Sequence, residues 1–156
     1  MTNNCQNENI RDVSSGFVVK SKCGKYLLGK ADGHIGPFCF TIFKGKQEIN
    51  ETLIDTAMRE LKEETGIDIA QDNRLNKNIS TNPIYDYSLR HKDVYVFILT
   101  DSEGALDNFP FACSSFWSDG KPEITDYRWF SLNEMMNFIF PSQRGLVEKL
   151  ERMEKK

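Results

Sequence analysis

The stretch from Gly45 to Ile67 constrains this chain most, because it places several acidic residues on one predicted helix. Glu60, Glu63 and Glu64 stand at positions i, i+3 and i+4, a spacing that brings side chains to one helix face. Like charges at this spacing repel and would weaken an isolated helix. Clustered carboxylates also supply the oxygen ligands that Mg2+ prefers. The pattern therefore predicts a divalent cation over this face.

Residues 52–65 are predicted to form the helix that carries these carboxylates, because the segment contains no Gly or Pro. Asn50 or Thr52 can cap its start, and Gly66 follows its last turn, where a left-handed residue is common. Arg59 falls outside the acidic arc when successive residues are placed about 100° apart. The same 100° spacing places an apolar stripe beside that arc: Leu53, Ile54, Ala57, Met58 and Leu61. We therefore expect the carboxylates at the edge of the buried face.

The spacing of the fixed residues in this stretch matches a known motif. They are Gly45, Glu51, Arg59-Glu60-Leu61, Glu63-Glu64 and Gly66-Ile67, and together they make a complete Nudix box. The chain thus resembles Nudix hydrolases, more loosely over residues 14–152. The resemblance implies an α/β fold of the α+β kind, an α/β/α sandwich with a mixed central sheet. It also implies that Mg2+ or Mn2+ assists hydrolysis of the diphosphate bond in a nucleoside diphosphate linked to another group.

The roles of the acidic residues follow from this resemblance. Glu63 and Glu64 are the expected main metal ligands, and Glu60 is a further ligand or the base that orients the attacking water. In the family the backbone carbonyl of the box glycine, here Gly45, is a ligand as well. Diphosphate hydrolysis needs phosphoryl charge neutralised and water activated, and bound metal does both. The alternative for an isolated acidic patch is a solvated helix face, which the complete motif disfavours.

Glu51 and Arg59 are expected to support the site. Glu51 lies at the predicted helix start, where a carboxylate suits the helix dipole. The resemblance implies an ion pair between the two residues that holds the loop against the helix. Without the motif, two unrelated surface charges would be the usual interpretation.

A further carboxylate outside the motif is commonly needed in the family, and Glu123 is our candidate. It stands in the segment PEITDYRWF, and a similar Pro-Glu followed by aromatic-Arg-Trp occurs in Nudix enzymes that act on RNA 5′ ends. Glu103 and Asp119 are rival candidates for the same role. An ordinary acid at the start of a strand is the alternative for Glu123.

Basic and aromatic residues near the motif are candidates for substrate contacts. Lys44 and Lys46 flank Gly45 and can bracket phosphates, although edge-strand lysines also guard against aggregation. Arg90, with His91 and Lys92, forms a basic turn that can meet another phosphate or simply be solvated. Five aromatic residues are candidates for stacking on a base, and since most aromatics belong to the core, at most one or two are expected to do so: Phe38, Tyr85, Tyr87, Phe116 and Trp117.

The lysine before the box glycine favours some substrates over others. The sequence Phe43-Lys44-Gly45-Lys46 resembles enzymes that act on dinucleoside polyphosphates and on capped or triphosphorylated RNA ends. The alternatives that remain open are ADP-ribose, other nucleoside diphosphate sugars and (d)NTPs, because the substrate is selected by pocket walls formed from residues outside the motif. A Nudix module that senses a nucleotide without cutting it is the non-enzyme alternative. Such modules usually lack one of the carboxylates that this chain keeps.

Composition limits the partners and the compartment. The 156 residues carry a formal net charge of −3, so no overall field recruits DNA. No apolar run is long enough for a membrane span. The cysteines are widely spaced, which predicts free thiols and a cytoplasmic protein: Cys5, Cys23, Cys39 and Cys113. The expected partner is a nucleotide, either a small molecule or the 5′ end of an RNA, and the protein is expected to be a monomer or homodimer.

The chain is expected to hold a flexible tail at residues 1–12 and one Nudix hydrolase domain at residues 13–156. Apolar runs predict strands at 15–20, 25–29, 38–43, 84–89, 94–100 and 123–132, with a brief strand at 67–69. Helices are predicted at 133–140 and after Pro141. Residues 71–79 are predicted to be a polar loop, and residues 101–122 a long loop that is functional or mobile.

Overall fold

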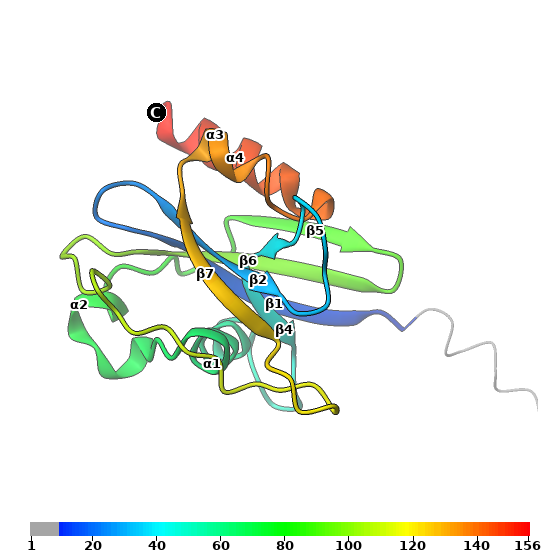
Figure 1. Cartoon of the computed structure of the whole chain (residues 1–156). Coiled ribbons are helices and arrows are strands. Elements are labelled where there is room, and N and C mark those ends of the chain that lie inside the picture. Colours follow the sequence, from blue (N-terminus) through cyan, green and yellow to red (C-terminus); the bar gives the residue numbers. More distant parts are fainter. Residues whose placement is uncertain (1–9) are drawn as a thin grey trace, which may run out of the picture.

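The computed structural model describes residues 10–156, and its centre is a seven-stranded mixed sheet between two helical layers (Figure 1). The strands are β1 (Asp12–Lys20), β2 (Tyr26–Ala31), β3 (Phe40–Thr41), β4 (Phe43–Lys46), β5 (Tyr85–Leu89), β6 (Lys92–Thr100) and β7 (Ile124–Phe130). The helices are α1 (Leu53–Thr65), α2 (Asn73–Asn76), α3 (Leu132–Met135) and α4 (Arg144–Glu154), with short 3-10 helices at Ile69–Gln71 and Pro141–Gln143.

Strand β1 organises the sheet because it pairs along both edges. It runs parallel to β6 from Asp12 opposite Lys92 to Lys20 opposite Thr100. Its other edge is antiparallel to β4 over its first half and to β2 at its end. Strand β5 forms an antiparallel hairpin with β6, so β6 lies between two neighbours as its apolar sequence predicted. Strand β4 pairs with β1 only, which leaves its outer edge available to α1.

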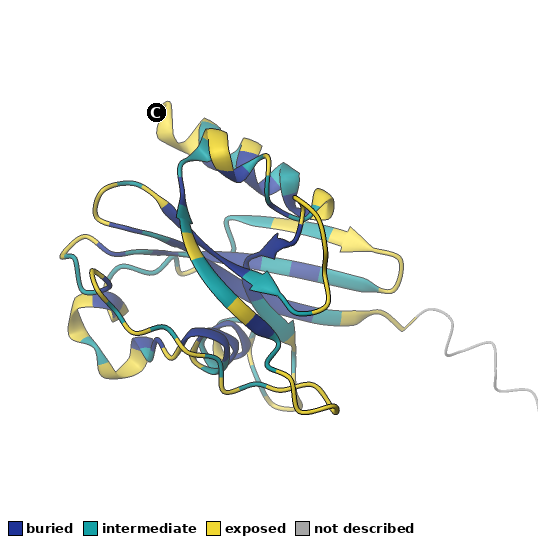
Figure 2. Cartoon of the chain, in the orientation of Figure 1, coloured by how far each residue is buried: buried dark blue, intermediate teal, exposed yellow. Residues whose placement is uncertain are grey.

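Two apolar clusters fill the two faces of the sheet, which confirms the predicted α/β/α sandwich. Side chains alternate along β1, so Phe17 and Val19 join one cluster and Val18 joins the other. The first cluster includes Leu61 of α1, and the second includes Leu146 of α4. Buried residues follow the strands and the inner faces of both helices in Figure 2.

Helix α1 forms where the sequence predicted it and has capped ends. Thr52 accepts a hydrogen bond from the Asp55 backbone at 3.2 Å, and the Asp55 carboxylate accepts one from the Thr52 backbone at 3.1 Å. This capping box satisfies two backbone donors that the first turn cannot. Gly66 ends the helix at φ 84°, the left-handed conformation that glycine adopts readily. Thr52 rather than Asn50 is therefore the cap.

The single strand predicted at 38–43 is wrong, because the chain changes partner within it. Phe40 and Thr41 pair with β2, whereas β4 pairs with β1. Ile42 lies between them, and its backbone N–H donates to the Gln143 side chain at 3.1 Å. The buried Gln143 thus replaces the ladder bond at the crossing point.

Three further predictions of local structure also differ from the fold. Residues 67–69 form no strand, because Ile67 and Ile69 are buried anchors against the α1 cluster without a partner strand. The predicted loop at 71–79 contains α2, which Asp72 caps through the Arg74 backbone at 2.9 Å. The helix predicted at 133–140 ends at Met135, because residues 138–140 instead bridge to Phe40.

The long segment 101–122 is fastened to the rest of the fold at both ends. The Asp101 backbone N–H donates to the Lys20 carbonyl of β1 at 2.8 Å, and the buried Asp101 carboxylate accepts from the backbones of Ala105 and Leu106 at 2.9 and 2.8 Å. Farther along, Ser114 donates from its backbone to the Glu63 carbonyl at 2.7 Å, at the C-terminal end of α1. The segment therefore holds the last turn of the helix that carries the acidic residues.

Some predictions fall outside the described residues. The tail predicted at 1–12 lies mostly there, as does Cys5, and Asp12 already belongs to β1. Cys23, Cys39 and Cys113 are free thiols, as predicted. Within residues 10–156, no helix combines the length and apolar character needed to cross a lipid bilayer.

Candidate active site

A cavity of about 470 Å³ opens where the acidic part of α1 meets β4. Its walls come from β1, β4, α1, the start of β6 and the end of the 101–122 segment, which are far apart in the sequence. Its lining residues are Asp12, Ser14, Lys44, Gly45, Lys46, Glu60, Lys92, Ser115, Trp117 and Glu123. Two carboxylates of the predicted site and both lysines beside the box glycine thus share one hollow.

Gly45 is needed at its position because the Glu60 carboxylate lies where a side chain would be. A Cβ atom built on Gly45 would be 2.0 Å from the Glu60 carboxyl carbon and 2.1 Å from its Oε1. Glu60 itself is 8% exposed. Burial, with the charge of Glu63 second, raises the pKa of Glu60 above its usual range. The Glu60 carboxylate of α1 therefore packs directly against the backbone of β4 at Gly45.

Glu64 lies on the outer edge of β4. Its Oε1 accepts a hydrogen bond from the Lys44 backbone N–H at 3.2 Å, and the residue is 4% exposed. Burial and the neighbouring Glu60 charge raise the pKa of Glu64 well above its usual range. Two buried carboxylates with raised pKa values therefore stand one helical turn apart, and a cation would stabilise both.

Arg59 points into the acidic group, which corrects the prediction that it lies on a separate arc. Its Nε donates to Glu51 at 2.8 Å and its Nη2 donates to the same carboxylate at 3.0 Å, which confirms the implied ion pair. Its Nη1 donates to Glu60 at 2.9 Å and lies 3.3 Å from both Glu63 carboxylate oxygens. The flexible arginine side chain therefore reaches across the arc that its Cα position defines.

Glu51 is held by more than its arginine partner. It also accepts hydrogen bonds from the Glu48 backbone at 2.9 Å and the Thr56 hydroxyl at 3.0 Å. The hydrogen bond from Arg59 is the largest cause that lowers the pKa of Glu51 to about 2. The carboxylate thus ties the loop before α1 to the helix in its charged form.

We expect Glu51→Gln to lower the free energy of unfolding at pH 7 by about 1–3 kcal/mol, the range for a lost hydrogen-bonded charge. The pKa of Glu51 is lower in the folded protein than the value of 4.5 for the unfolded chain, so the charged carboxylate stabilises the fold above pH 4.5. This contribution is lost as the pH falls toward 2. The difference between wild type and variant should therefore shrink below pH 4.5 in urea unfolding measured from pH 3 to 7. Glu48→Gln is the control, because that carboxylate is 67% exposed and 3.8 Å from Arg59. A loss that stays constant across this pH range would contradict the prediction.

The predicted basic residues are only partly brought to the cavity. Lys44 and Lys46 line it, and Lys46 also pairs with Asp12 at 3.4 Å. Arg90 lies on the exposed β5–β6 turn and is not among the lining residues. Its neighbour Lys92 lines the cavity instead, because β6 begins opposite Asp12 of β1. Burial and then the Lys92 charge lower the pKa of Lys44 to about 8.

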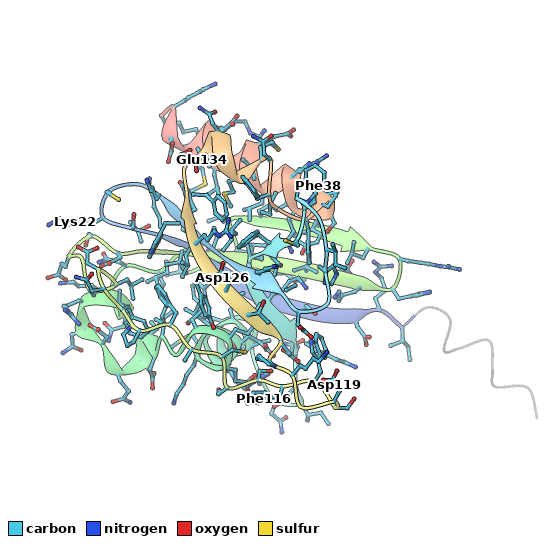
Figure 3. The ribbon with its side chains drawn as sticks, in the orientation of Figure 1. Lys22, Phe38, Phe116, Asp119, Asp126 and Glu134 are labelled. Atoms are coloured by element: carbon cyan, nitrogen blue, oxygen red, sulfur yellow. The ribbon has the colours of Figure 1, made fainter. Side chains whose placement is uncertain are left out.

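Glu123 is brought to the acidic group, as the sequence suggested. It lines the cavity, and its charge contributes to the raised pKa values of both Glu60 and Glu64, after burial and the nearer carboxylates. The rivals lie elsewhere. Glu103 pairs with Lys77 at 3.3 Å, and Asp119 accepts from the Lys121 backbone at the exposed loop tip (Figure 3).

A second hollow of about 180 Å³ adjoins the first and is more apolar. The two share Lys44, Trp117 and Glu123, and the second is completed by Ala31, His34, Thr41, Ile42, Glu64, Ile124 and Phe140. Of the five predicted stacking residues, Trp117 lines both hollows. Figure 3 shows Phe38 beside α4 and Phe116 at the loop tip. His34 and Phe140, whose rings are 4.9 Å apart, were missed because only the fold brings them together.

A family model for the NUDIX domain matches residues 11–150. The chain belongs to the Nudix family. A search of curated proteins by sequence found no match. Similar solved structures confirm the Nudix fold. They include a MutT protein from Methanosarcina mazei Go1, with 21% identity, TM-score 0.61 and coverage of 96% of this chain and 99% of that one.

Two other similar structures are of proteins associated with particular nucleotides. A Caenorhabditis elegans Ap4A hydrolase, in a binary complex, has 20% identity and TM-score 0.64, with 92% of this chain and 98% of that chain covered. The NUDIX domain of Shewanella oneidensis NrtR, complexed with ADP ribose, has 14% identity and TM-score 0.67, with 98% and 94% covered. The Nudix fold is thus shared by proteins with different nucleotide ligands.

Nudix proteins generally use a divalent metal, and the residues of this Nudix domain fit one. Glu60 and Glu64 are buried carboxylates with raised pKa values, and Gly45 leaves its backbone open to them. Hard cations such as Mg2+ take such oxygen donors. In residues 10–156, however, no three acidic, histidine or cysteine side chains are gathered as a ready metal site. Arg59 explains this, because its guanidinium lies between Glu60 and Glu63.

Proposed function

We propose that this Nudix domain is a Mg2+- or Mn2+-dependent pyrophosphohydrolase that cuts the diphosphate linkage of a nucleotide with water. The favoured substrates are dinucleoside polyphosphates and RNA 5′-triphosphate ends. One observation carries the proposal: an acidic wall with Glu60 and Glu123 and a basic wall with Lys44 and Lys46 face the same cavity. A phosphate chain needs positive groups for its oxygens and carboxylates for a metal and water.

The chain's own residues have distinct parts in this proposal. Glu60, Glu63, Glu64 and Glu123, with the Gly45 carbonyl, would hold the metal. The metal, when bound, would neutralise phosphoryl charge and acidify a water molecule. Lys44 and Lys46 bind phosphate oxygens and hold the diphosphate in line with the water. The water oxygen bonds to phosphorus, the bond to the bridging oxygen breaks, and Glu60 or Glu123 takes the water proton.

The Glu51–Arg59 pair has a positioning part. Arg59 donates to the Lys46 carbonyl at 2.9 Å as well as to Glu51 and Glu60. It therefore links the loop after Gly45 to the acidic helix. The adjoining apolar hollow supports a nucleoside at one end of the substrate, because His34, Phe140 and Trp117 offer ring faces beside the phosphate cavity.

A substrate panel tests the proposal. Purified protein is incubated with Mg2+, Mn2+ or EDTA and with diadenosine tetraphosphate, a 5′-triphosphorylated RNA, nucleoside triphosphates, ADP-ribose and a nucleoside diphosphate sugar. We expect metal-dependent release of nucleotide or phosphate, fastest for one of the first two. Fastest turnover of ADP-ribose, the sugar nucleotide or a nucleoside triphosphate would establish the alternative substrate class.

A nucleotide-sensing module is the second candidate, because Arg59 already neutralises two of the carboxylates. Tight nucleotide binding without turnover of any panel member, with either metal, would support the sensor and reject the hydrolase.

Glu123→Gln tests the carboxylate outside the motif. We expect turnover to fall about a hundredfold, on the scale of a lost acid–base group, with stability unchanged or higher because a negative charge leaves the acidic wall. Glu103→Gln is the matched control, since Glu103 lies in the long segment that precedes Glu123 but pairs with Lys77. Equal turnover of Glu123→Gln and Glu103→Gln would remove Glu123 from the chemistry.

A further inference from the structure

Lys44 and Lys92 meet on one face of the sheet although strand β1 separates the strands that carry them. Lys44 lies opposite Gly16, and Lys92 lies opposite Asp12. Positions 12 and 16 of β1 point to the same side, because side chains alternate along a strand. Gly16 leaves room for this approach, since a Cβ there would be 2.5 Å from the Lys44 Cβ. Both lysines line the 470 Å³ cavity.

These two ammonium groups lack an acidic partner within the described part of the chain. Neither forms an ion pair in residues 10–156, whereas Lys46 pairs with Asp12. Two like charges that share a cavity repel each other, and an anion bound between them offsets this repulsion. Asp12, the one acidic lining residue on their side, is already paired with Lys46 at 3.4 Å. The geometry therefore leaves an anion position next to Lys92.

The order of charges places this position away from the acidic wall. Strand β4, which carries Lys44, has the acidic helix α1 along its outer edge and β1 along its other edge, and β6 with Lys92 lies beyond β1. Lys44 is also bound through its backbone to Glu64. The sequence of groups across the cavity is therefore carboxylates, then Lys44, then Lys92. A phosphate chain that begins at the carboxylates would reach Lys92 only with a group beyond its first two phosphates.

We propose that Lys92, beyond Lys44, binds a phosphate that lies outside the scissile diphosphate, so the site selects chains of three or more phosphates. This inference rests on the proposed function and narrows its substrate class. Dinucleoside polyphosphates and 5′-triphosphate ends carry the additional anionic group. ADP-ribose and nucleoside diphosphate sugars have two phosphates and cannot supply it. Lys92 is thus a specificity-determining residue for substrate length.

The test compares Lys92→Gln with wild type and with Lys22→Gln. Lys22 is an exposed lysine at the far end of the sheet in Figure 3, so its removal changes net charge alone. Binding of inorganic tripolyphosphate is measured by calorimetry in EDTA. We expect Lys92→Gln to weaken this binding about ten- to a hundredfold, the scale of one charged contact. Lys22→Gln should bind tripolyphosphate as wild type does.

Kinetics provide the second measurement. For a triphosphate or tetraphosphate substrate, Lys92→Gln should raise KM about tenfold or more with kcat unchanged, and it should leave ADP-ribose parameters alone. Wild type that does not bind tripolyphosphate, or Lys92→Gln that binds it equally well, would overturn the inference. An equal rise in KM for ADP-ribose and for the triphosphate or tetraphosphate substrate would also overturn it. Because the binding measurement needs no turnover, an inactive protein would refute the proposed hydrolase without deciding the phosphate site.

Discussion

Replacing Glu64 with glutamine is expected to reduce turnover by roughly a thousandfold, the scale of losing a main electrostatic contribution to a transition state. The side chain is buried, accepts a hydrogen bond from the Lys44 backbone and adjoins Glu60. Glutamine keeps the size and the hydrogen-bond acceptor but removes the charge that would hold a cation. Steady-state kinetics with Mg2+ and with Mn2+ measure the loss.

The same variant should unfold less easily in the absence of metal. Burial, then the Glu60 charge, raises the pKa of Glu64 above the unfolded value of 4.5. A raised carboxyl pKa means that the charged form costs stability above pH 4.5, and the cost is absent below it, where both states are protonated. In EDTA, the free energy of unfolding of Glu64→Gln should exceed that of wild type at pH 7, and the gap should close toward pH 4.

The control for Glu64→Gln is Glu148→Gln, on the exposed face of α4, which should change neither measurement. Turnover within twofold of wild type would remove Glu64 from the mechanism. A variant less stable than wild type at pH 7 in EDTA would show that a partner already compensates the buried charge.

Gly45→Ala is expected to separate activity from stability. The added Cβ would lie 2.0 Å from the Glu60 carboxyl carbon, so the carboxylate must move. That group is the far end of a flexible side chain, and Gly45 is not among the positive-φ glycines, so the backbone accepts alanine. We expect a loss of about 1 kcal/mol or less in unfolding free energy, but about a hundredfold lower turnover, the scale of a misplaced catalytic group.

Gly16→Ala is the contrasting variant, because its added Cβ would lie 2.1 Å from the Phe43 carbonyl oxygen and 2.7 Å from the Lys44 Cα. Backbone atoms in a paired strand cannot move aside, so we expect about 1–3 kcal/mol of lost stability, the range for overpacking. Urea unfolding and kinetics on both variants make the comparison. Gly45→Ala with full turnover would show that the Glu60 position against Gly45 has no part in the reaction.

The contiguous part of the site could be predicted because its geometry is local. Helix α1, its Thr52 cap, its Gly66 end and its apolar stripe depend on the 3.6-residue period and on neighbouring side chains. The Glu51–Arg59 pair lies within the same segment and was also predicted correctly. Arg59 was predicted to point away from the acidic residues, but it reaches Glu60 and Glu63 because its long side chain extends around the helix from its Cα atom.

Elements that depend on a distant partner were predicted less well. Residues 38–43 are apolar enough for one strand, but the change of partner from β2 to β1 divides them at Ile42. Residues 67–69 alternate like a strand, yet no strand lies beside them. The predicted helix at 133–140 ends early because the Phe138 carbonyl accepts from the Phe40 backbone at 3.1 Å. In each case a long-range contact overrides the local pattern.

The sequence by itself determined the family motif, the helix that carries the carboxylates and the class of chemistry, because these depend on residues a few positions apart. Only the tertiary structure decided which other groups share the cavity. The parallel pairing of β1 with β6 brings Lys92 rather than Arg90 to it, and the end of the 101–122 segment brings Glu123. The physical reason is that strand register joins residues across the whole chain, and no local spacing records which strands will pair.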